Sequence, residues 1–230
     1  MIYLTGDTHG NISRIEKFCD KFQTSKQDII IILGDAGFNY YLNLNDYDLK
    51  LKAESLPITF FCIHGNHEER PQNISNYQEV IFHNGVAFQQ EQFPSLYFAK
   101  DGEFYNFNKK QCLALGGAYS VDKQYRIAMG YKWYASEQPN ALEKQRIEQE
   151  IAKHNYQTDI VLSHTCPYHT MPKHLFLKTI DQSKIDNSME LWFQEISEKL
   201  SFQHWYFGHY HADWKNNKFQ MLFENIIELV

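Results

Sequence analysis

Hydrophobic and polar positions in the first third of the chain alternate between two kinds of segment. Continuous apolar runs lie in MIYLT at the start, in DIIIIL from Asp28 and in PITFFCI from Pro57, and such runs are typical of strands buried on both faces. Between them, Ile12–Phe22 repeats apolar side chains at helical spacing, and a second helix is expected over Asn45–Ser55. Strands that alternate with helices predict a parallel sheet.

The pattern changes in the middle of the chain. Between Ile81 and Tyr119, short strand-like segments are separated by the turn signals Asp101-Gly102 and Asn108-Lys109, so we expect hairpins. Ser120–Gln138 is rich in aromatic and basic residues without a clear period, and we expect an ordered loop there.

The last third alternates again. A charged amphipathic helix is expected over Ala141–His154, a strand over DIVLSH, and a further helix near Ser188–Leu200. The chain then continues with the strand-like HWYF and a terminal hairpin in WKNNKFQMLFENIIELV. No repeat or linker interrupts the pattern, so it predicts a single domain over residues 1–230, an α/β fold with an antiparallel second half.

Composition narrows the class of protein. Hydrophobic residues make up 43% of the 230 positions, which is too many for a disordered chain. No apolar run approaches the roughly 18 residues of a membrane span, the start of the chain lacks signal-peptide features, and four scattered cysteines indicate no disulfide framework. We therefore expect a soluble, cytoplasmic protein with no membrane partner.

Charge and histidine content point toward metal chemistry. With 22 Lys and Arg against 28 Asp and Glu, the formal net charge is −6, which makes nucleic acid an unlikely partner. The chain has 11 histidines and only 4 cysteines, a balance that suits hard or borderline metals better than soft ones.

Metal-competent side chains follow predicted strands at five places. The segments are Gly6-Asp7-Thr8-His9, Gly34-Asp35, Gly65-Asn66-His67-Glu68, Ser163-His164 and Gly208-His209-Tyr210-His211. Asp7, Asp35 and Asn66 succeed one another at intervals of about 30 residues, the length of a β-α-β unit, so they should converge at one sheet edge. In extended backbone, residues i and i+2 point the same way, so His9 should join Asp7, and His211 should join His209.

This residue set fits a pair of cations. Two aspartates, one asparagine and four histidines offer mixed oxygen and nitrogen donors for two metal ions about 3.5–4 Å apart, with Asp35 from the middle strand as the bridging carboxylate. Such a pair activates a shared water and neutralises phosphate oxygens, as in-line displacement at phosphorus requires. Each motif alone has an ordinary explanation, a helix cap at Asp7 or a turn at Asn66, but five in order favour a metal site.

The order of these motifs resembles the calcineurin-like metallophosphoesterase superfamily. Its pattern of D-x-H, G-D, G-N-H-[E/D], H and G-H-x-H is matched from Asp7 to His211. The resemblance implies a four-layer α/β/β/α sandwich with mixed β-sheets and two divalent metal ions, for which Mn²⁺ is expected and Fe, Zn or Mg are alternatives.

The resemblance also implies a role for each residue. Asp7, His9, Asp35 and His211 would hold one metal, and the other would be held by Asp35, Asn66, His164 and His209. His67 would lie beside the metals without binding them. A metal-bridging hydroxide would attack phosphorus, and His67 would assist the leaving group.

One subgroup is matched only in part. GDTHG and GNHE resemble the serine/threonine protein phosphatases and their short phage and bacterial relatives, whose middle motif is G-D-x-V-D-R-G. Here Phe38 and Asn39 stand where that subgroup has Asp and Arg, and His64 stands where it has another Arg. The departure leaves phosphate-ester hydrolysis intact but argues against a protein-phosphatase assignment.

Another cation must then contact the phosphate. Arg70 lies four residues after Asn66, and Arg126 lies in the aromatic and basic loop; both are candidate substrate-binding residues, because a bidentate arginine suits phosphate. Selectivity is expected from three loops, Phe38–Asp46, Tyr119–Trp133 and Cys166–Asp181. The tyrosines and tryptophan of the second loop either stack on a substrate ring or, more often in such segments, pack in the core.

The leading hypothesis is a dinuclear metal-dependent phosphoesterase, either a phosphatase or a phosphodiesterase, with a phosphate ester as its substrate. Two alternatives stand beside it: a nuclease of the same superfamily, and a non-catalytic binding scaffold on the same fold. Monoesters, diesters, phosphoproteins and nucleotides all fit the same metal core, and the sequence leaves the oligomeric state open.

Overall fold

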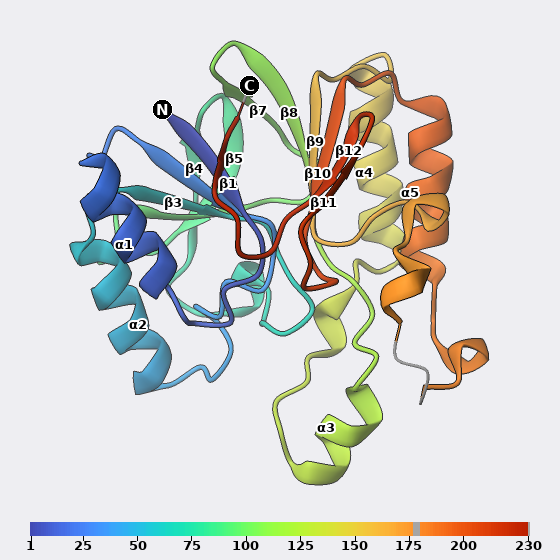
Figure 1. Ribbon diagram of the computed structural model, residues 1–230, viewed down its shortest axis with the longest axis horizontal. Coiled ribbons are helices and arrows are strands. Elements are labelled where there is room, and N and C mark those ends of the chain that lie inside the picture. The colour runs from blue at the N-terminus through green and yellow to red at the C-terminus, as the bar shows by residue number, and fades with distance from the viewer. Residues whose placement is uncertain (177–179, 230) are drawn as a thin grey trace.

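Two β-sheets pack face to face in the computed structural model, which describes residues 1–176 and 180–229 (Figure 1). Helices α1 and α2 cover the outer face of one sheet, and α4 and α5 cover the outer face of the other. The expected four-layer α/β/β/α sandwich with mixed sheets is therefore confirmed. Part of the predicted loop Cys166–Asp181, residues 177–179, lies outside the described residues.

The first sheet has seven strands in the order β13-β1-β2-β3-β6-β5-β4. Its strands are β1 Ile2–Thr5, β2 Ile29–Ile32, β3 Thr59–Cys62, β4 Gln78–Phe82, β5 Gly85–Gln89, β6 Leu96–Ala99 and β13 Ile227–Glu228. The central strands β1, β2, β3 and β6 run parallel, as the β-α-β pattern predicts.

The second sheet has six strands in the order β11-β12-β10-β9-β8-β7. Its strands are β7 Phe104–Phe107, β8 Lys110–Leu115, β9 Ile160–Ser163, β10 His204–Phe207, β11 Trp214–Asn216 and β12 Phe219–Met221. The antiparallel second half that the sequence predicts is wrong, because β8, β9, β10 and β12 are parallel neighbours and only the outer strands run antiparallel.

The helices agree with the sequence pattern with one addition. The α-helices are α1 Ser13–Phe22, α2 Leu44–Ser55, α3 Lys123–Met129, α4 Ala141–Lys153 and α5 Ser188–Lys199. Helix α3 and a 3₁₀ turn at Ala135–Glu137 lie within Ser120–Gln138, where an ordered loop was expected. Helix α3 buries no residue, so it has no apolar face whose period the sequence could reveal.

Turn signals in the middle of the chain were only partly informative. Asn108 and Lys109 form the hairpin turn between β7 and β8, with positive φ at both residues. Asp101-Gly102 is a turn but makes no hairpin, because β6 pairs in the first sheet and β7 pairs in the second. At the end of the chain, β11 and β12 form the expected hairpin, after which β13 returns to pair with β1.

Three apolar layers hold the sandwich together. The layer between the sheets contains Phe61, Tyr105 and Phe107, all fully buried and in edge contact around Phe61. A second layer lies under α1 and α2, and a third, centred on Trp205 and Phe193, lies under α4 and α5. Burial on both faces explains why the central strands are continuous apolar runs. Among the described residues, no helix has both the length and the apolar composition needed to cross a membrane.

The start of α4 gives a direct test of these local interactions. The Asn140 side chain accepts hydrogen bonds from the backbone of Leu142 and Glu143, and Glu143 bonds back to the Asn140 N–H, whereas Asn187 at the start of α5 makes no cap bond. We expect Asn140→Ala to lower the free energy of unfolding by about 1 kcal/mol. The matched change Asn187→Ala should have a clearly smaller effect in the same urea titration, and equal losses would contradict the assignment.

Candidate metal centre

Five strand ends meet at one edge of the sandwich. The turns after β1, β2 and β3 of the first sheet lie against the turns after β9 and β10 of the second. These turns carry all seven predicted ligands, and backbone bonds join them, such as Gly208 N–H to the His164 carbonyl at 2.9 Å and His9 N–H to the Asp35 carbonyl at 2.8 Å. The convergence inferred from the strand spacing is therefore present in the fold.

Asp7 is fully buried and divides its two oxygens between different neighbours. Oδ1 accepts the backbone N–H of His209 at 2.9 Å, which joins the first sheet to the second. Oδ2 is buried and accepts no hydrogen bond, but it lies 3.3 Å from His211 Nε2 and 3.8 Å from His9 Nε2. The two imidazole nitrogens are themselves 2.9 Å apart. One carboxylate oxygen and two imidazoles thus converge on one point.

Asp35 has the same division of its oxygens. Oδ1 accepts the backbone N–H of His67 at 2.8 Å. Oδ2 lies 3.6 Å from His164 Nε2, 3.9 Å from His9 Nδ1 and 3.9 Å from His67 Nε2. This oxygen therefore stands between His9 on one side and His164 on the other, as a bridging ligand would.

Asn66 and His164 bring two acceptor atoms together. The His164 ring contacts the Leu33 carbonyl through Nδ1 at 2.8 Å, and the Asn66 amide nitrogen donates to Ser120 Oγ at 2.9 Å. In neutral His164, Nδ1 carries the proton, so the lone pair of Nε2 faces Asn66 Oδ1 at 2.8 Å. His209 lies beside this pair, with its ring centre 4.9 Å from that of His164. Two acceptors this close fit a cation between them.

The pKa values reflect this concentration of buried charge. Burial acts to raise the pKa of Asp7 and Asp35, but the neighbouring imidazoles, His164 first, hold both below their ordinary value. Burial lowers the pKa of His209 to about 3, and contact with Asp7 raises the pKa of His211. The carboxylates are thus ionised and His209 is neutral near pH 7, as metal ligation requires.

The pairs Asp7/His9 and His209/His211 reach the site through turns, contrary to the expected extended backbone. His9, His209 and His211 have φ of 45°, 69° and 50°, and Asp35 has φ of 50°. Left-handed backbone in residues with a Cβ costs about 1 kcal/mol or more each and is concentrated at functional sites. The i, i+2 argument therefore named residues that do lie together, but they are brought together by left-handed turns and not by extended backbone.

Glycines before the ligands make room for ligands from other strands. A Cβ on Gly34 would overlap the His164 ring, one on Gly65 would overlap Asp35, and one on Gly208 would overlap Asp7. The close approach of the strand ends, more than the turn itself, requires glycine at these three positions.

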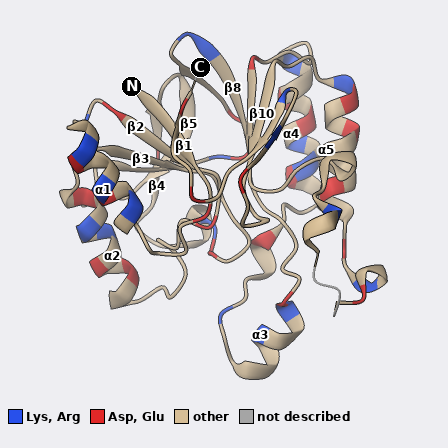
Figure 2. Cartoon of the chain, in the orientation of Figure 1, with Lys and Arg blue, Asp and Glu red and all other residues tan. Residues whose placement is uncertain are grey.

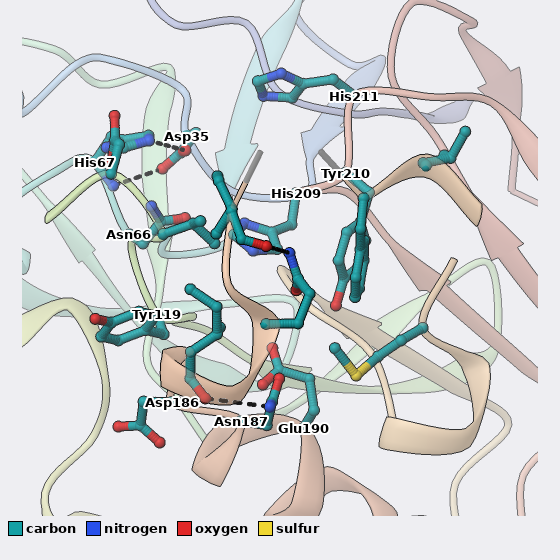
Figure 3. Close-up of a pocket in the computed structure, with 18 residues that line it drawn as sticks. Asp35, Asn66, His67, Tyr119, Asp186, Asn187, Glu190, His209, Tyr210 and His211 are labelled. Atoms are coloured by element: carbon teal, nitrogen blue, oxygen red, sulfur yellow. Dashed lines mark hydrogen bonds and ion pairs between the residues drawn. The ribbon is translucent and has the colours of Figure 1, made fainter. Parts of the chain in front are cut away.

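Two cavities adjoin the cluster. One, of about 320 Å³, is lined by Asn66, His209 and several apolar side chains (Figure 3). The other, of about 610 Å³, is lined by His9, Tyr40, Tyr41 and Arg126. Asp35, His67, Asp122 and His211 line both, so the candidate metal centre lies between the two spaces.

His67 and Arg126 lie together beside the cluster. Arg126 Nη2 is 3.4 Å from His67 Nε2, and the guanidinium is held by Asp122 at 2.8 Å and by the Tyr40 hydroxyl at 3.1 Å. Burial lowers the pKa of His67; Asp35 opposes this shift, and Arg126 adds to it. A cation and an imidazole therefore face the same space, although neither belongs to the ligand cluster.

Arg70 is not brought to the cluster. It is 4% exposed, pairs with Asp101, donates from Nε to the Ser136 carbonyl at 2.7 Å, and lines a separate cavity with His64. The loop between Asn66 and Arg70 leads the chain away from the cluster, so nearness in sequence does not bring the Arg70 guanidinium to it. Of the aromatic loop, Tyr119 lines the smaller cavity, Tyr134 is buried, and Tyr125 and Tyr131 are exposed.

Several residues at the site carry no signal in the sequence. Ser120 orients Asn66, Asp122 holds Arg126, and the Arg14 guanidinium donates to the carbonyls of Gly6 and Asp7 at 2.7 and 2.8 Å. They come from loops or a helix face without a fixed spacing to the motifs, so only the fold reveals them.

Comparison with known proteins identifies the family of this chain. The model of the calcineurin-like phosphoesterase family matches residues 1–213. Among solved structures, phosphopantetheinyl hydrolase (PptH) from Mycobacterium tuberculosis is 12% identical, with 96% of this chain and 89% of that chain covered and a TM-score of 0.45. A protein of unknown function, AQ665 from Aquifex aeolicus, is 11% identical over 72% of this chain and 80% of that chain, with a TM-score of 0.33. A search of curated proteins gives no match.

The family match spans all five strand ends, and their side chains form a group of carboxylate, amide and imidazole donors suited to divalent metal ions, buried at Asp7, Asp35 and His164 and open to solvent at His9 and His211. The chain belongs to the calcineurin-like phosphoesterase family, and it is a metal-dependent hydrolase of phosphate esters.

Proposed function

We propose that the site holds two divalent cations and hydrolyses phosphate esters. Asp7, His9, Asp35 and His211 bind one cation, and Asp35, Asn66, His164 and His209 bind the other. The observation that carries this proposal is a buried acceptor without a donor: Asp7 Oδ2 accepts no hydrogen bond, although His211 Nε2 lies 3.3 Å from it and His9 Nε2 3.8 Å. Buried lone pairs that face one another are costly unless a cation lies between them.

The donor set limits the choice of metal. Carboxylate, amide and imidazole ligands suit Mn²⁺, Fe, Zn²⁺ or Mg²⁺, and the described cysteines, Cys19, Cys62, Cys112 and Cys166, are buried outside the ligand cluster. Mn²⁺ remains our choice, on availability. When bound, the cations supply a water of lowered pKa and neutralise charge on the phosphate.

The protein's own groups orient the ester and the proton. Arg126, fixed by Asp122 and Tyr40, presents its guanidinium to the phosphate oxygens, and His67 delivers a proton to the leaving oxygen or stabilises the charge that develops on it. The His67 backbone N–H holds Asp35 Oδ1, so the same residue orients the bridging carboxylate. Arg70 has no part in this proposal, because Asp101 and Ser136 occupy its guanidinium.

Two alternatives, a binding scaffold and a nuclease, have less support. A binding scaffold on this fold has no need of a complete ligand set, yet all seven residues are present and in contact, so metal content by elemental analysis distinguishes the two. For a nuclease we expect a continuous basic surface, but lysines and arginines are mixed with acidic residues over the outer helices (Figure 2).

Metal binding has a measurable signature in stability. A ligand that binds only the folded state at 100 times its dissociation constant adds about 2.7 kcal/mol. We expect Mn²⁺ added to chelator-treated protein to raise Tm, and Asp35→Asn to remove most of that rise and the bound metal. Asp28→Asn, at an aspartate that pairs with the N-terminus far from the cluster, should leave both unchanged. A Tm insensitive to several metals would contradict the site.

Activity separates ligand residues from His67. Asp35→Ala and Asn66→Ala should abolish hydrolysis of an aryl phosphate in Mn²⁺, because each removes a donor to the cations. His67→Ala should lower kcat by about 10²- to 10⁴-fold, the usual contribution of a general acid, while metal content stays at the wild-type level. The idea fails if wild type and variants are equally inert toward mono- and diesters in every metal tested.

The arginine has its own test. Hydrogen bonds to charged groups contribute about 1.5–3 kcal/mol, so Arg126→Ala should lower kcat/KM by about 10- to 100-fold, with Arg126→Lys recovering part of the loss. Lys132→Ala removes a side-chain cation from the same loop but keeps the backbone carbonyl that contacts Arg126, so it serves as the control. If the Arg126 and Lys132 variants lower kcat/KM equally, the loss comes from the overall charge of the loop and not from a contact between Arg126 and the phosphate.

A further inference from the structure

The two cavities beside the metal centre differ in chemistry. The smaller one, here called the apolar cavity, is walled by Met171, Leu175, Phe176, Ile180, Ile185 and Tyr210. The larger one, here called the aromatic-basic cavity, has Tyr40, Tyr41 and Arg126 in its wall. Because Asp35 and His67 line both, a phosphorus atom at the metal centre has space for a substituent on each side.

A phosphate monoester uses only one of these spaces. A monoester has a single organic arm, so water fills the other cavity when the monoester binds. The apolar wall of that cavity then gains no stabilisation from burial against a ligand. A diester fills both. The apolar cavity, at about 320 Å³, lies at the small end of the range for small-molecule sites, so its occupant is a compact group rather than a polymer or a protein chain.

Charge restricts the arm that enters the apolar cavity. Asp186 and Glu190 line it, and none of its described lining residues is a lysine or an arginine (Figure 3). Glu190 is buried and accepts a hydrogen bond from the Thr165 hydroxyl at 2.7 Å, so it is fixed in place. An anionic arm, such as a further phosphate of a nucleotide or a nucleic-acid strand, would face the side chains of Asp186 and Glu190.

We propose that the substrate is a small phosphodiester whose retained arm is apolar and carries no negative charge. That arm lies in the apolar cavity, and the leaving arm lies in the aromatic-basic cavity, where His67 Nε2 stands 3.4 Å from Arg126. The inference rests on the proposed hydrolase function and adds the substrate class.

The reaction consumes one water. The water oxygen forms a bond to phosphorus, and the phosphorus–oxygen bond to the leaving arm breaks with its electron pair on that oxygen. His67 delivers a proton to the leaving oxygen and then regains one from solvent, into which the attacking water releases its own. The products are the alcohol of the leaving arm and a phosphate monoester that keeps the apolar arm.

Three synthetic diesters with one leaving group test the proposal. Methyl, phenyl and 4-carboxyphenyl p-nitrophenyl phosphate all release p-nitrophenol and differ only in the second arm. For wild type in Mn²⁺, we expect kcat/KM for the phenyl ester to exceed that for the methyl ester by about tenfold or more, since even one buried methylene is worth about tenfold. The 4-carboxyphenyl ester should fall at least about tenfold below the phenyl ester.

A matched pair of variants locates the effect. Ile185→Glu puts a carboxylate into the wall of the apolar cavity and should bring the phenyl-to-methyl ratio close to one, and a cooperative thermal unfolding transition shows that the variant is folded. Ile81→Glu makes the same change on strand β4, where the side chain is 74% exposed, and should leave the ratio as in wild type.

Failure of the inference and failure of the function look different. Suppose that the esters are hydrolysed. If wild type then shows no preference among the retained arms or prefers the 4-carboxyphenyl arm, or if Ile185→Glu keeps the wild-type preference, the proposed substrate class is wrong and the hydrolase function remains. If p-nitrophenyl phosphate and all three diesters are inert in Mn²⁺, Fe²⁺, Zn²⁺ and Mg²⁺, the proposed function fails and the inference fails with it.

Discussion

Two buried carboxylates determine how the ends of the two sheets meet. Asp7 and Asp35 are nearly inaccessible to solvent, and an ionised carboxylate without partners is very costly in such a place. In each carboxylate, one oxygen accepts a hydrogen bond from a backbone N–H and the other faces imidazole rings. Because the N–H that Asp7 accepts belongs to the opposite sheet, the carboxylate also fixes the separation of the strand ends above the inter-sheet core.

Crowding at this edge explains the unusual backbone around the site. Glycine is required where the side chain of one strand end fills the space of another, as His164 does at Gly34. Left-handed backbone at Asp35 and at the histidines turns the donors inward and costs energy that only a tightly determined structure sustains. The apolar layers on both faces of each sheet hold the strand ends in place and so sustain this strained backbone. Bound cations would stabilise it further, since they compensate the buried charge.

Sequence reasoning succeeded where the spacing reflects topology. The β-α-β interval put Asp7, Asp35 and Asn66 on one edge because parallel strands return to the same edge, and buried apolar runs marked the central strands. It failed where partners are chosen at long range. A turn signal such as Asp101-Gly102 specifies local backbone but not which sheet the next strand joins, so β6 and β7 were paired wrongly.

Nearness in sequence was also a poor guide to which arginine lies at the site. Arg70 follows Asn66 closely but pairs with Asp101 in the turn between β6 and β7, whereas Arg126 is distant in sequence and lies beside His67. Ser120, Asp122 and Glu190 could not be found at all, because their spacing to the motifs is set by loop lengths. The proposed metal ligands lie at strand ends, where topology fixes their spacing. The residues that line the two cavities lie mostly in loops, where it does not.

This distinction accounts for the departure from the protein-phosphatase motif. Phe38 is fully buried against Phe60, and Asn39 accepts hydrogen bonds from Lys50 and Tyr77, so both positions serve packing beneath the site. The guanidinium beside His67 comes instead from α3, where Asp122 and Tyr40 hold it. A cation carried by a loop can change its position without disturbing the ligand turns. The same metal core is therefore compatible with a different substrate wherever the loops after β2, β8 and β9 differ, and the specificity of this chain has to be sought in those loops rather than in its metal ligands.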